Sequence, residues 1–259
     1  MARLIILTIT VIIFLQGCAS YKQKNQSIGQ FDFHKIKKSD SIFYSKYEVT
    51  NIQYKSFLKS VMDGDSSNYS ELKINNLGWI EEYRFSFNKP MARNYHAHIA
   101  FDNYPVVNIS FDAALKYCDW LNIIDETEKY YYRLPTQSEF LFLVKTVNIK
   151  YDSDNIMDYD QCDFNFNLKF EGNYTIDGGM FTVLANEEVH AYLGRRANME
   201  KYKQNKAGIM HIIGNVSEML DNANYTGGNW DSLPSEVLSI KKYTKPLPTL
   251  GFRIVKVLK

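Results

Sequence analysis

Apolar residues recur every three or four positions in three segments of the chain, a spacing that predicts amphipathic helices. Each segment follows a residue that suits a helix N-cap, namely Thr50, Ser110 or Thr136. The third start is the clearest, because Thr136 and Glu139 have the spacing of a capping box directly after Pro135. The faces expected to be buried are Tyr54, Phe57, Leu58 and Val61 in the first helix, Phe111, Ala114, Leu115 and Cys118 in the second, and Phe140, Leu143, Val144 and Val147 in the third.

Short runs of aromatic and β-branched residues predict four strands, at residues 42–47, 106–109, 130–134 and 252–257. Residues 148–207 show neither the helical nor the strand period, so we expect a long irregular stretch there. Its Asp-x-Asp, at Asp152 and Asp154, is similar to the start of a calcium loop. The glycine and the closing glutamate of an EF-hand are missing, which favours a solvated loop.

The N-terminus has a different hydrophobic pattern, because Arg3 is followed by an uncharged run from Leu4 to Leu15. A run of 12 residues is too short to span a bilayer, which requires about 20 residues. A basic start, a short apolar run and small residues favour a secretory signal. The ending Leu-Gln-Gly-Cys resembles a bacterial lipoprotein signal, which implies cleavage before Cys18 and a lipid anchor on that residue. An ordinary signal peptide that contains a cysteine is the alternative.

These patterns divide the chain into a signal peptide at residues 1–17, a lipidated cysteine with a polar tether at 18–40, and one domain at 41–259. The expected location is the bacterial cell envelope, with the membrane reached through the lipid anchor. Ala19 and Ser20 follow the cysteine without an early acidic run. That favours the outer membrane, with the domain facing the periplasm.

Charge argues against a nucleic-acid partner. Loss of residues 1–17 would remove one arginine and leave 29 basic and 29 acidic residues. The net charge is then zero, whereas nucleic-acid binding requires a clustered basic surface. About 240 residues are enough for one proper hydrophobic core. Two cysteines remain after Cys18, and the sequence leaves open whether Cys118 and Cys162 form a disulfide.

Six segments, in this order, resemble the formylglycine-generating enzyme, or sulfatase-modifying factor, domain family. They are YEVTNIQYKSFL, YPVVNISFDAALKYCDWLN, YRLPTQSEF, AGIMHIIGNVSEML, TGGNW and GFRIV, and they span about 210 residues. The resemblance implies an irregular α+β fold related to C-type lectins, with long loops and few regular elements. Within these segments we expect Trp120 and Trp230 in the core, and positive φ angles at Gly227 and Gly228. Arg253 is expected to be a partly buried cation whose acidic partner the sequence does not identify.

The family's chemistry depends on two cysteines that follow the glycine pair. They bind copper(I) and oxidise a cysteine of the sulfatase substrate to formylglycine. Counted from Gly227 and Gly228, their positions hold Ser232 and Val237. A hydroxyl is a hard ligand and valine offers none, whereas copper(I) requires soft thiolates. We therefore predict that the chain is not an enzyme and has no catalytic residues.

The family also holds a structural calcium ion, through an Asn or Asp, two backbone carbonyls and a Glu. The resemblance places the carbonyls at Gly214 and Val216 and the carboxylate at Glu218, but His211 occupies the Asn or Asp position. Imidazole is a poor calcium ligand. Calcium is therefore a weak candidate cofactor, and local capping or pairing by Glu218 is the alternative.

Histidines are the remaining candidate ligands. His96 and His98 form a His-x-His, but two ligands without a third do not make a metal site, so surface or core histidines are favoured. Some relatives are iron-dependent sulfoxide synthases, which require three histidines, or two and a carboxylate. His34, His190 and His211 complete the set in this chain.

Together these features predict an envelope lipoprotein with a non-catalytic domain that binds or scaffolds a protein partner. Its architecture resembles lipoproteins of gliding motility and type IX secretion. The expected contact surface is a groove around Trp230, Asp231 and Ser232. A metal-dependent oxidoreductase is the alternative, and the lectin-like fold also admits a carbohydrate-binding module.

Overall fold

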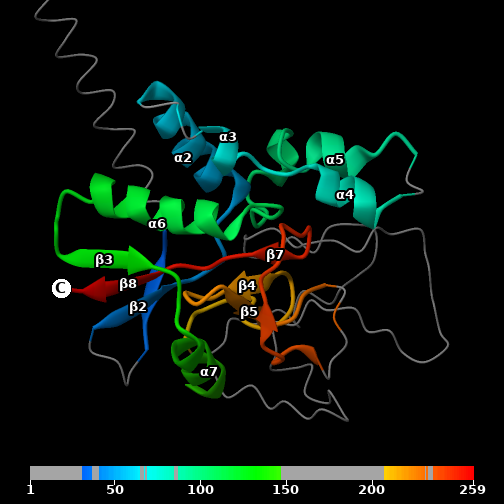
Figure 1. The fold of residues 1–259 in the computed structure, drawn as a ribbon. Coiled ribbons are helices and arrows are strands. Elements are labelled where there is room, and N and C mark those ends of the chain that lie inside the picture. The colour runs from blue at the N-terminus through cyan, green and yellow to red at the C-terminus, as the bar shows by residue number, and fades with distance from the viewer. Residues whose placement is uncertain are drawn as a thin grey trace, which may run out of the picture.

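The computed structural model describes residues 31–36, 41–64, 67, 69–84, 87–146, 207–230, 232 and 236–259. Short helices and strands are joined by long loops, which is the irregular α+β fold that the resemblance implies (Figure 1). In chain order, the elements are β1 (Phe33–Lys35), β2 (Ile42–Ser45), α2 (Asn51–Asp63), α3 (Tyr69–Leu72), α4 (Leu77–Glu82), α5 (Pro90–Asn94), η2 (Ile99–Phe101), α6 (Phe111–Ile124), β3 (Tyr130–Arg133), α7 (Gln137–Thr146), β4 (Ser217–Met219), β5 (Asn224–Thr226), β6 (Lys241–Lys242), β7 (Leu250–Gly251) and β8 (Val255–Leu258).

The described strands form two four-stranded sheets. The first has the order β1-β2-β8-β3 with every pair antiparallel, so the C-terminal strand β8 lies between strands from the first half of the chain. The second has the order β6-β5-β4-β7, in which β4 and β7 are parallel. Residues 252–254 connect β7 to β8 and therefore join the two sheets.

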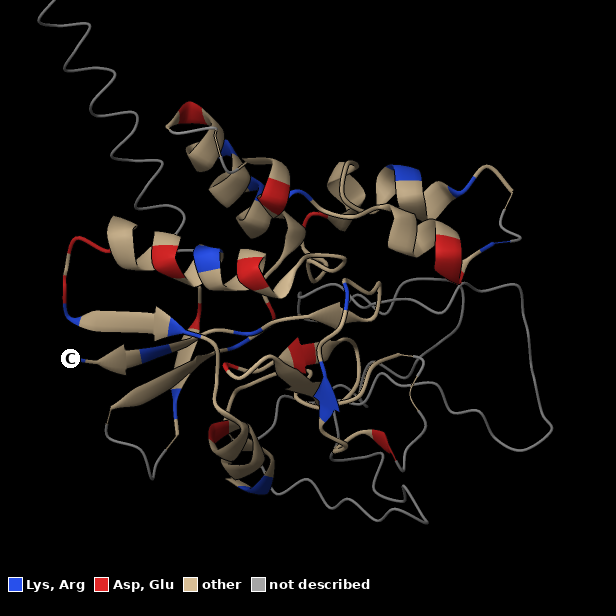
Figure 2. Cartoon of the chain, viewed as in Figure 1, with Lys and Arg blue, Asp and Glu red and all other residues tan. Residues whose placement is uncertain are grey.

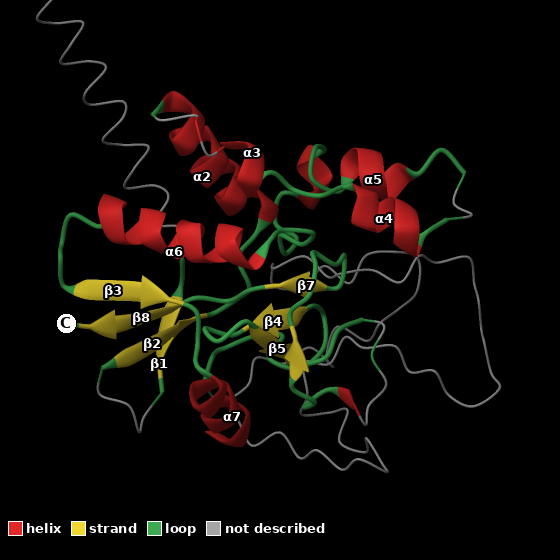
Figure 3. Ribbon diagram, in the orientation of Figure 1, coloured by secondary structure: helices red, strands yellow, loops and turns green. Residues whose placement is uncertain are grey.

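The three helices predicted from periodicity are present, and side chains cap each of them. Thr50 and Gln53 form a full capping box at α2, and the Ser110 hydroxyl accepts the backbone N–H of Ala113 at α6. At α7 the Thr136 hydroxyl accepts from the Glu139 N–H at 3.1 Å, and the Glu139 carboxylate accepts from the Thr136 N–H at 2.8 Å. Helices α2 and α6 lie on one side of the first sheet and α7 on the other (Figure 3).

One detail of the helical faces differs from the prediction. Leu115 is exposed, because the buried face of α6 is centred on Ala114, Tyr117 and Leu121. Helix α7 buries Phe140, Leu143 and Val144, as the apolar spacing predicts. Val147 lies outside the described residues.

The strand predicted at 106–109 is wrong. These residues are buried but belong to no strand, because Asn108 has a φ of 59° and interrupts the extended backbone. Single hydrogen bonds take the place of a ladder: the N–H of Val106 donates to Val49, and that of Asn108 donates to Leu247.

The other three strand predictions hold in outline, with shifted ends. The segment at 252–257 forms a strand only from Val255, because Gly251 belongs to β7 in the second sheet. The sequence assigns Phe33–Lys35 to the tether, yet these residues form β1. Phe33 packs against Tyr132, and Ile36 is buried, so the fold begins before residue 41.

The buried apolar residues form three clusters. The largest packs α2 and α6 against the first sheet, around Phe57, Tyr117 and Phe252. The second lies around α7 and the third around α4 and α5. Within the described residues, no helix combines the length and apolar character that a membrane span requires.

Candidate functional site

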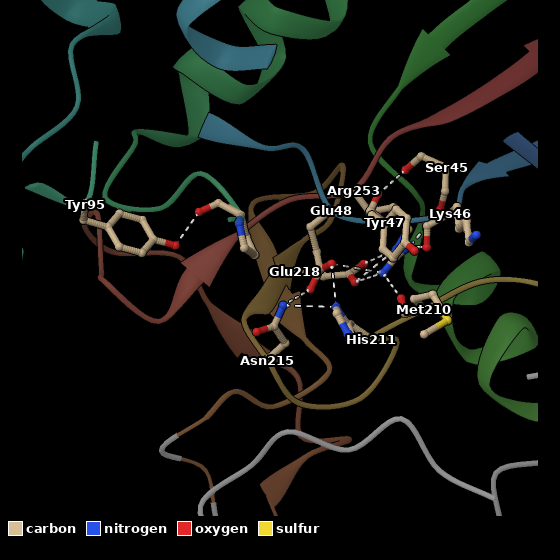
Figure 4. A network of polar contacts seen from close by, with 11 residues as sticks. Ser45, Lys46, Tyr47, Glu48, Tyr95, Met210, His211, Asn215, Glu218 and Arg253 are labelled. Atoms are coloured by element: carbon tan, nitrogen blue, oxygen red, sulfur yellow. Dashed lines mark hydrogen bonds and ion pairs between the residues drawn. The ribbon is translucent and has the colours of Figure 1, made fainter. Parts of the chain in front are cut away.

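Five polar side chains meet at the junction of the two sheets, and we call them the Arg253 cluster: Glu48, His211, Asn215, Glu218 and Arg253 (Figure 4). Arg253 stands in the link between β7 and β8, Glu218 is in β4, and Glu48 follows β2. All five residues are buried. The cluster therefore ties together segments that are far apart in the sequence.

Arg253 uses all of its N–H donors. Its Nε and Nη2 donate to the Glu218 carboxylate, at 3.1 and 2.8 Å. Nη1 donates to the carbonyls of Ser45 and Lys46, and Nη2 also donates to the carbonyl of Met210. A guanidinium offers five N–H groups, and each has an acceptor here. The acidic partner that the sequence does not identify is thus Glu218, and the cation is fully buried.

A second carboxylate shares this site. Glu48 accepts from the side-chain amide of Asn215 at 2.9 Å, and its other oxygen lies 3.5 Å from His211 Nδ1 and 3.9 Å from Arg253. Burial would raise the pKa of Glu48, but His211 and Arg253 together lower it below its usual value. Burial raises the pKa of Glu218, and the nearby Glu48 carboxylate adds to that rise although Arg253 opposes it. The cluster therefore buries two carboxylates beside one guanidinium.

Residues 227–230, with Ser232 and Val237, are here named the glycine turn, and packing closes it. Gly228 has a φ of +67°, and a Cβ on it would lie 2.7 Å from a methyl group of Val237. Gly227 has a φ of +94°, and a Cβ there would lie 3.1 Å from the carbonyl of Ile212. Only glycine fits such positions without strain, so the prediction of positive φ at both residues is confirmed.

Hydrogen bonds complete the glycine turn and attach it to the Arg253 cluster. The Ser232 hydroxyl accepts the Asn229 N–H at 3.0 Å, and the Ser232 N–H donates to the Asn229 carbonyl at 2.9 Å. The Trp230 N–H donates to the Asn215 carbonyl at 2.9 Å. Asn215 thereby contacts the turn through its backbone and Glu48 through its side chain.

The predicted groove residues do not lie together on the described surface. Trp230 and Ser232 are buried, at 4% and 5% exposure, and Asp231 lies outside the described residues. Trp230 packs in the third core cluster with Trp79 and Tyr95, so its prediction as a core aromatic is confirmed, as is that of Trp120. The groove itself stays a prediction.

The calcium positions lie inside the Arg253 cluster. Both oxygens of Glu218 accept from Arg253, so a calcium ion would compete with this guanidinium for the carboxylate. Gly214 has a φ of 83°, and its N–H donates to the Gly227 carbonyl at 2.7 Å. His211 points toward Glu48. The calcium set of Gly214, Val216 and Glu218 stays a prediction.

The described histidines occupy separate settings. His96 is half-buried: its Nε2 accepts from the Trp79 indole at 3.4 Å, so its Nδ1 carries the proton and donates to Asn51 at 2.8 Å. Burial lowers the pKa of His96 to about 3. His98 is exposed and caps η2, and His34 pairs with Asp32. Within the described residues, no three His, Cys, Asp or Glu side chains are grouped as metal ligands.

Pairing of Cys118 with Cys162 stays as open as it is from the sequence, because only Cys118 lies in the described residues. Cys118 is buried in α6, and burial raises the pKa of its thiol. Cys162, His190 and the lipid-anchor candidate Cys18 lie outside the described residues.

Comparison with known proteins identifies the family. Residues 8–258 match the sulfatase-modifying factor enzyme 1-like domain. The chain belongs to this family. No curated protein matches the chain significantly. Among solved structures, PvdO from Pseudomonas aeruginosa is similar at 16% identity and a TM-score of 0.50, covering 84% of this chain and 80% of that one.

Two further solved structures match over similar lengths. CarF is 17% identical with a TM-score of 0.48, over 84% of this chain and 87% of CarF. Treponema denticola variable protein 1 is 13% identical with a TM-score of 0.45, over 83% and 84% of the two chains. At these identities the likeness concerns the fold alone.

The copper positions of the family do not fit copper in this chain. Val237 is 1% exposed and packs in the second core cluster against Gly228. Ser232 accepts a backbone N–H and thereby closes a turn. Neither side chain offers sulfur, so the ligand pair of a copper(I) site is missing.

Proposed function

We propose that this chain is an envelope-anchored lipoprotein whose sulfatase-modifying factor domain binds or scaffolds another protein and does not catalyse. One observation carries the proposal: both copper positions have structural roles. Val237 fills the space beside Gly228, and Ser232 closes the turn with Asn229. The scaffold of the family is retained, while the thiolates that its oxidation chemistry requires are replaced.

Anchoring through Cys18 is the second part of the proposal. It is supported by the short apolar N-terminal run and the Leu-Gln-Gly-Cys ending. We expect a radiolabelled fatty acid to label the wild-type protein in cells and to leave Cys18→Ser unlabelled. We also expect Cys18→Ser to move from the membrane fraction to the soluble fraction. Unchanged labelling of the variant would contradict the anchor.

The partner is proposed to be an envelope protein, and gliding motility with type IX secretion is the proposed pathway. A C-terminally tagged full chain, extracted from envelopes in mild detergent, should recover a partner at near-equal amount. Recovery of the tagged chain alone, under conditions that preserve other envelope complexes, would contradict the scaffold.

Metal analysis of the same preparation addresses the oxidoreductase alternative. The lipoprotein proposal expects no stoichiometric copper or iron. A full equivalent of either metal, lost in variants of the remaining histidines or cysteines, would favour the enzyme.

A further inference from the structure

An open groove lies between α2, α3, α6 and β3, and we call it the helical groove. Its volume is about 1080 Å³. Residues that line it include Phe57, Leu72, Asp112, Asp119, Ile123 and Tyr131. Helices α2, α3 and α6 lie on the opposite side of the molecule from α7, and β5, which leads into the glycine turn, lies below β7 on the side away from these helices (Figure 1). The groove is therefore distinct from the family's copper positions.

The floor of the groove belongs to the core and its rim is exposed. Phe57, Leu72 and Trp120 are buried, at 1%, 5% and 8% exposure. Ile123 is 78% exposed and Tyr131 is 48% exposed. Large apolar side chains at the rim of a cavity mark a surface that gains free energy when a partner covers it.

The charge of the groove is acidic, although the whole chain is close to neutral. Glu71, Asp112 and Asp119 line it, and among its described lining residues Lys116 is the one cation, with its Nζ 3.9 Å from Asp119. Figure 2 shows acidic and basic bands along α6 and an acidic band in α3. Three carboxylates against one ammonium group leave a local excess of negative charge. The complementary partner carries lysine or arginine.

The walls and edges of the groove favour a helix over a strand. Its volume of about 1080 Å³ lies at the upper limit of small-molecule pockets, which measure about 300–1,000 Å³. Strand addition at β3 is obstructed, because the Asn122 side chain bonds both the N–H and the carbonyl of Tyr132, at 2.7 and 2.9 Å. Apolar walls formed by helices suit the apolar face of an amphipathic helix.

We propose that the helical groove docks a cationic amphipathic helix of another envelope protein, whose apolar face covers Ile123 and Tyr131 while its basic residues face Asp112 and Asp119. This inference rests on the proposed function, because a docking groove presupposes a binding module. It adds the chemistry of the partner and places the contact on α6.

The probe is a fluorescent helical peptide of about 15 residues, with leucine on one face and lysine on the other. Its matched control replaces each lysine with glutamate. Anisotropy is measured against the full mature chain, with the lipid-anchor cysteine replaced by serine to keep the protein monomeric. We expect the lysine peptide to bind, the glutamate peptide not to bind, and added salt to weaken the interaction.

Two variants locate the contact. Asp112→Asn with Asp119→Asn should weaken binding of the lysine peptide about tenfold. The matched control is Glu81→Gln with Glu236→Gln, which removes the same charge at acids that pair with Lys245 and Lys241 outside the groove. It should change affinity less than about twofold. Ile123→Ser removes an exposed side chain and should weaken binding about fivefold without loss of thermal stability.

Equal weakening by both double variants would overturn the proposal, because the contact would then be general electrostatic attraction. Equal binding of the lysine and glutamate peptides, or binding of neither, would also overturn it. These results can be told apart from failure of the proposed function. If the envelope partner is still recovered with Asp112→Asn/Asp119→Asn and with Ile123→Ser, the binding module stands and the groove is wrong. Self-association of the chain that Ile123→Ser abolishes would make a second copy the occupant and would overturn the proposal.

Discussion

The Arg253 cluster and the glycine turn lie side by side and are joined through Asn215, but they differ in the chemistry of their side chains. In the cluster, charged side chains are buried and every N–H of the buried arginine has an acceptor. In the turn, the glycines are kept, but the two positions that carry thiolates in the family hold Ser232 and Val237. The polar side chains of the cluster pair with one another in the core. The side chains at the two positions in the turn close its backbone and offer no thiolate.

This difference separates what the fold requires from what oxidation chemistry requires. Removing one partner from a buried ion pair is costly, so such a cluster is constrained by stability. Copper ligands stabilise only a metal-loaded site, and here their positions serve packing and a turn. The comparison therefore supports a domain retained as a scaffold.

The largest effect should come from Arg253→Met. This change leaves the Glu218 and Glu48 carboxylates buried without their cation, and we expect a loss of about 3–5 kcal/mol in the free energy of unfolding. Urea denaturation followed by circular dichroism measures it. The control is Lys245→Met, whose partner Glu81 is exposed, and it should cost at most about 1 kcal/mol. If both variants lost a similar amount of unfolding free energy, the structural role of the cluster would be contradicted.

Gly228→Ala should have the next largest effect. The added Cβ meets Val237 at 2.7 Å on a backbone with positive φ, so we expect a loss of about 1–3 kcal/mol. Gly64→Ala is the control, because its Cβ meets nothing closer than 3.4 Å and its φ is −100°. A Gly228→Ala protein as stable as the control would mean that the turn is not closed by Val237.

A partly buried ion pair between β3 and α7 gives an intermediate case for this comparison. Arg133 donates two hydrogen bonds to Glu139, at 2.7 and 2.6 Å, and Glu139 also caps α7. Burial alone would raise the pKa of Glu139. The hydrogen bonds from Arg133 and from the Thr136 N–H outweigh burial, so the pKa lies below its usual value. Because the folded pKa lies below the unfolded value, the stabilisation is present near neutral pH and is lost on acidification.

Glu139→Gln keeps the cap and removes the charge. At pH 7 we expect a loss of about 1–2 kcal/mol, less than for Arg253→Met because solvent screens part of this pair. As the pH falls below about 4.5 the difference between the wild type and the variant should shrink, and it should vanish once the pH is below the lowered pKa of folded Glu139, where the wild-type carboxylate is protonated. Denaturation of both proteins at pH 7 and at pH 3 tests this. A stability difference that is larger at pH 3 would contradict the lowered pKa of Glu139.

The smallest effect should come from Ser232→Ala. It removes the acceptor for the Asn229 N–H in a buried turn, which should cost about 1 kcal/mol. Ser232→Thr keeps the hydroxyl and serves as the control. Ser232→Ala should not affect recovery of the envelope partner. If the variant no longer recovers the partner, the contact surface is the predicted groove at Trp230.

Local features of the fold could be predicted from the sequence. The helix starts at Thr50, Ser110 and Thr136 depend on contacts within three residues, and the structure contains all three caps. The strand at 106–109 could not be excluded, because its apolar pattern reports burial and not the positive φ of Asn108. Leu115 shows the same limit, since spacing predicts a helical face without fixing which residues the sheet covers.

Distant contacts of the candidate site could not be predicted. Arg253 contacts Glu218, 35 residues away, and also lies near Glu48 from the other end of the domain. They come together because β8 is inserted between the early strands β2 and β3, which places the short connection from β7 to β8 beside Glu48. The helical groove depends on the packing of three helices and one strand, which no single segment encodes. The residues at the family's two copper positions could be predicted from the sequence, because these positions follow the glycine pair at a fixed distance.

The most direct test of the central claim is a titration of the purified full chain with copper(I) against a competing chelator. If the domain is a scaffold without copper ligands, the chelator should keep the metal, and Ser232→Ala should not change the amount of copper(I) that the protein binds. One equivalent of copper(I) held by the protein against the chelator, together with formylglycine in a cysteine peptide, would contradict the account.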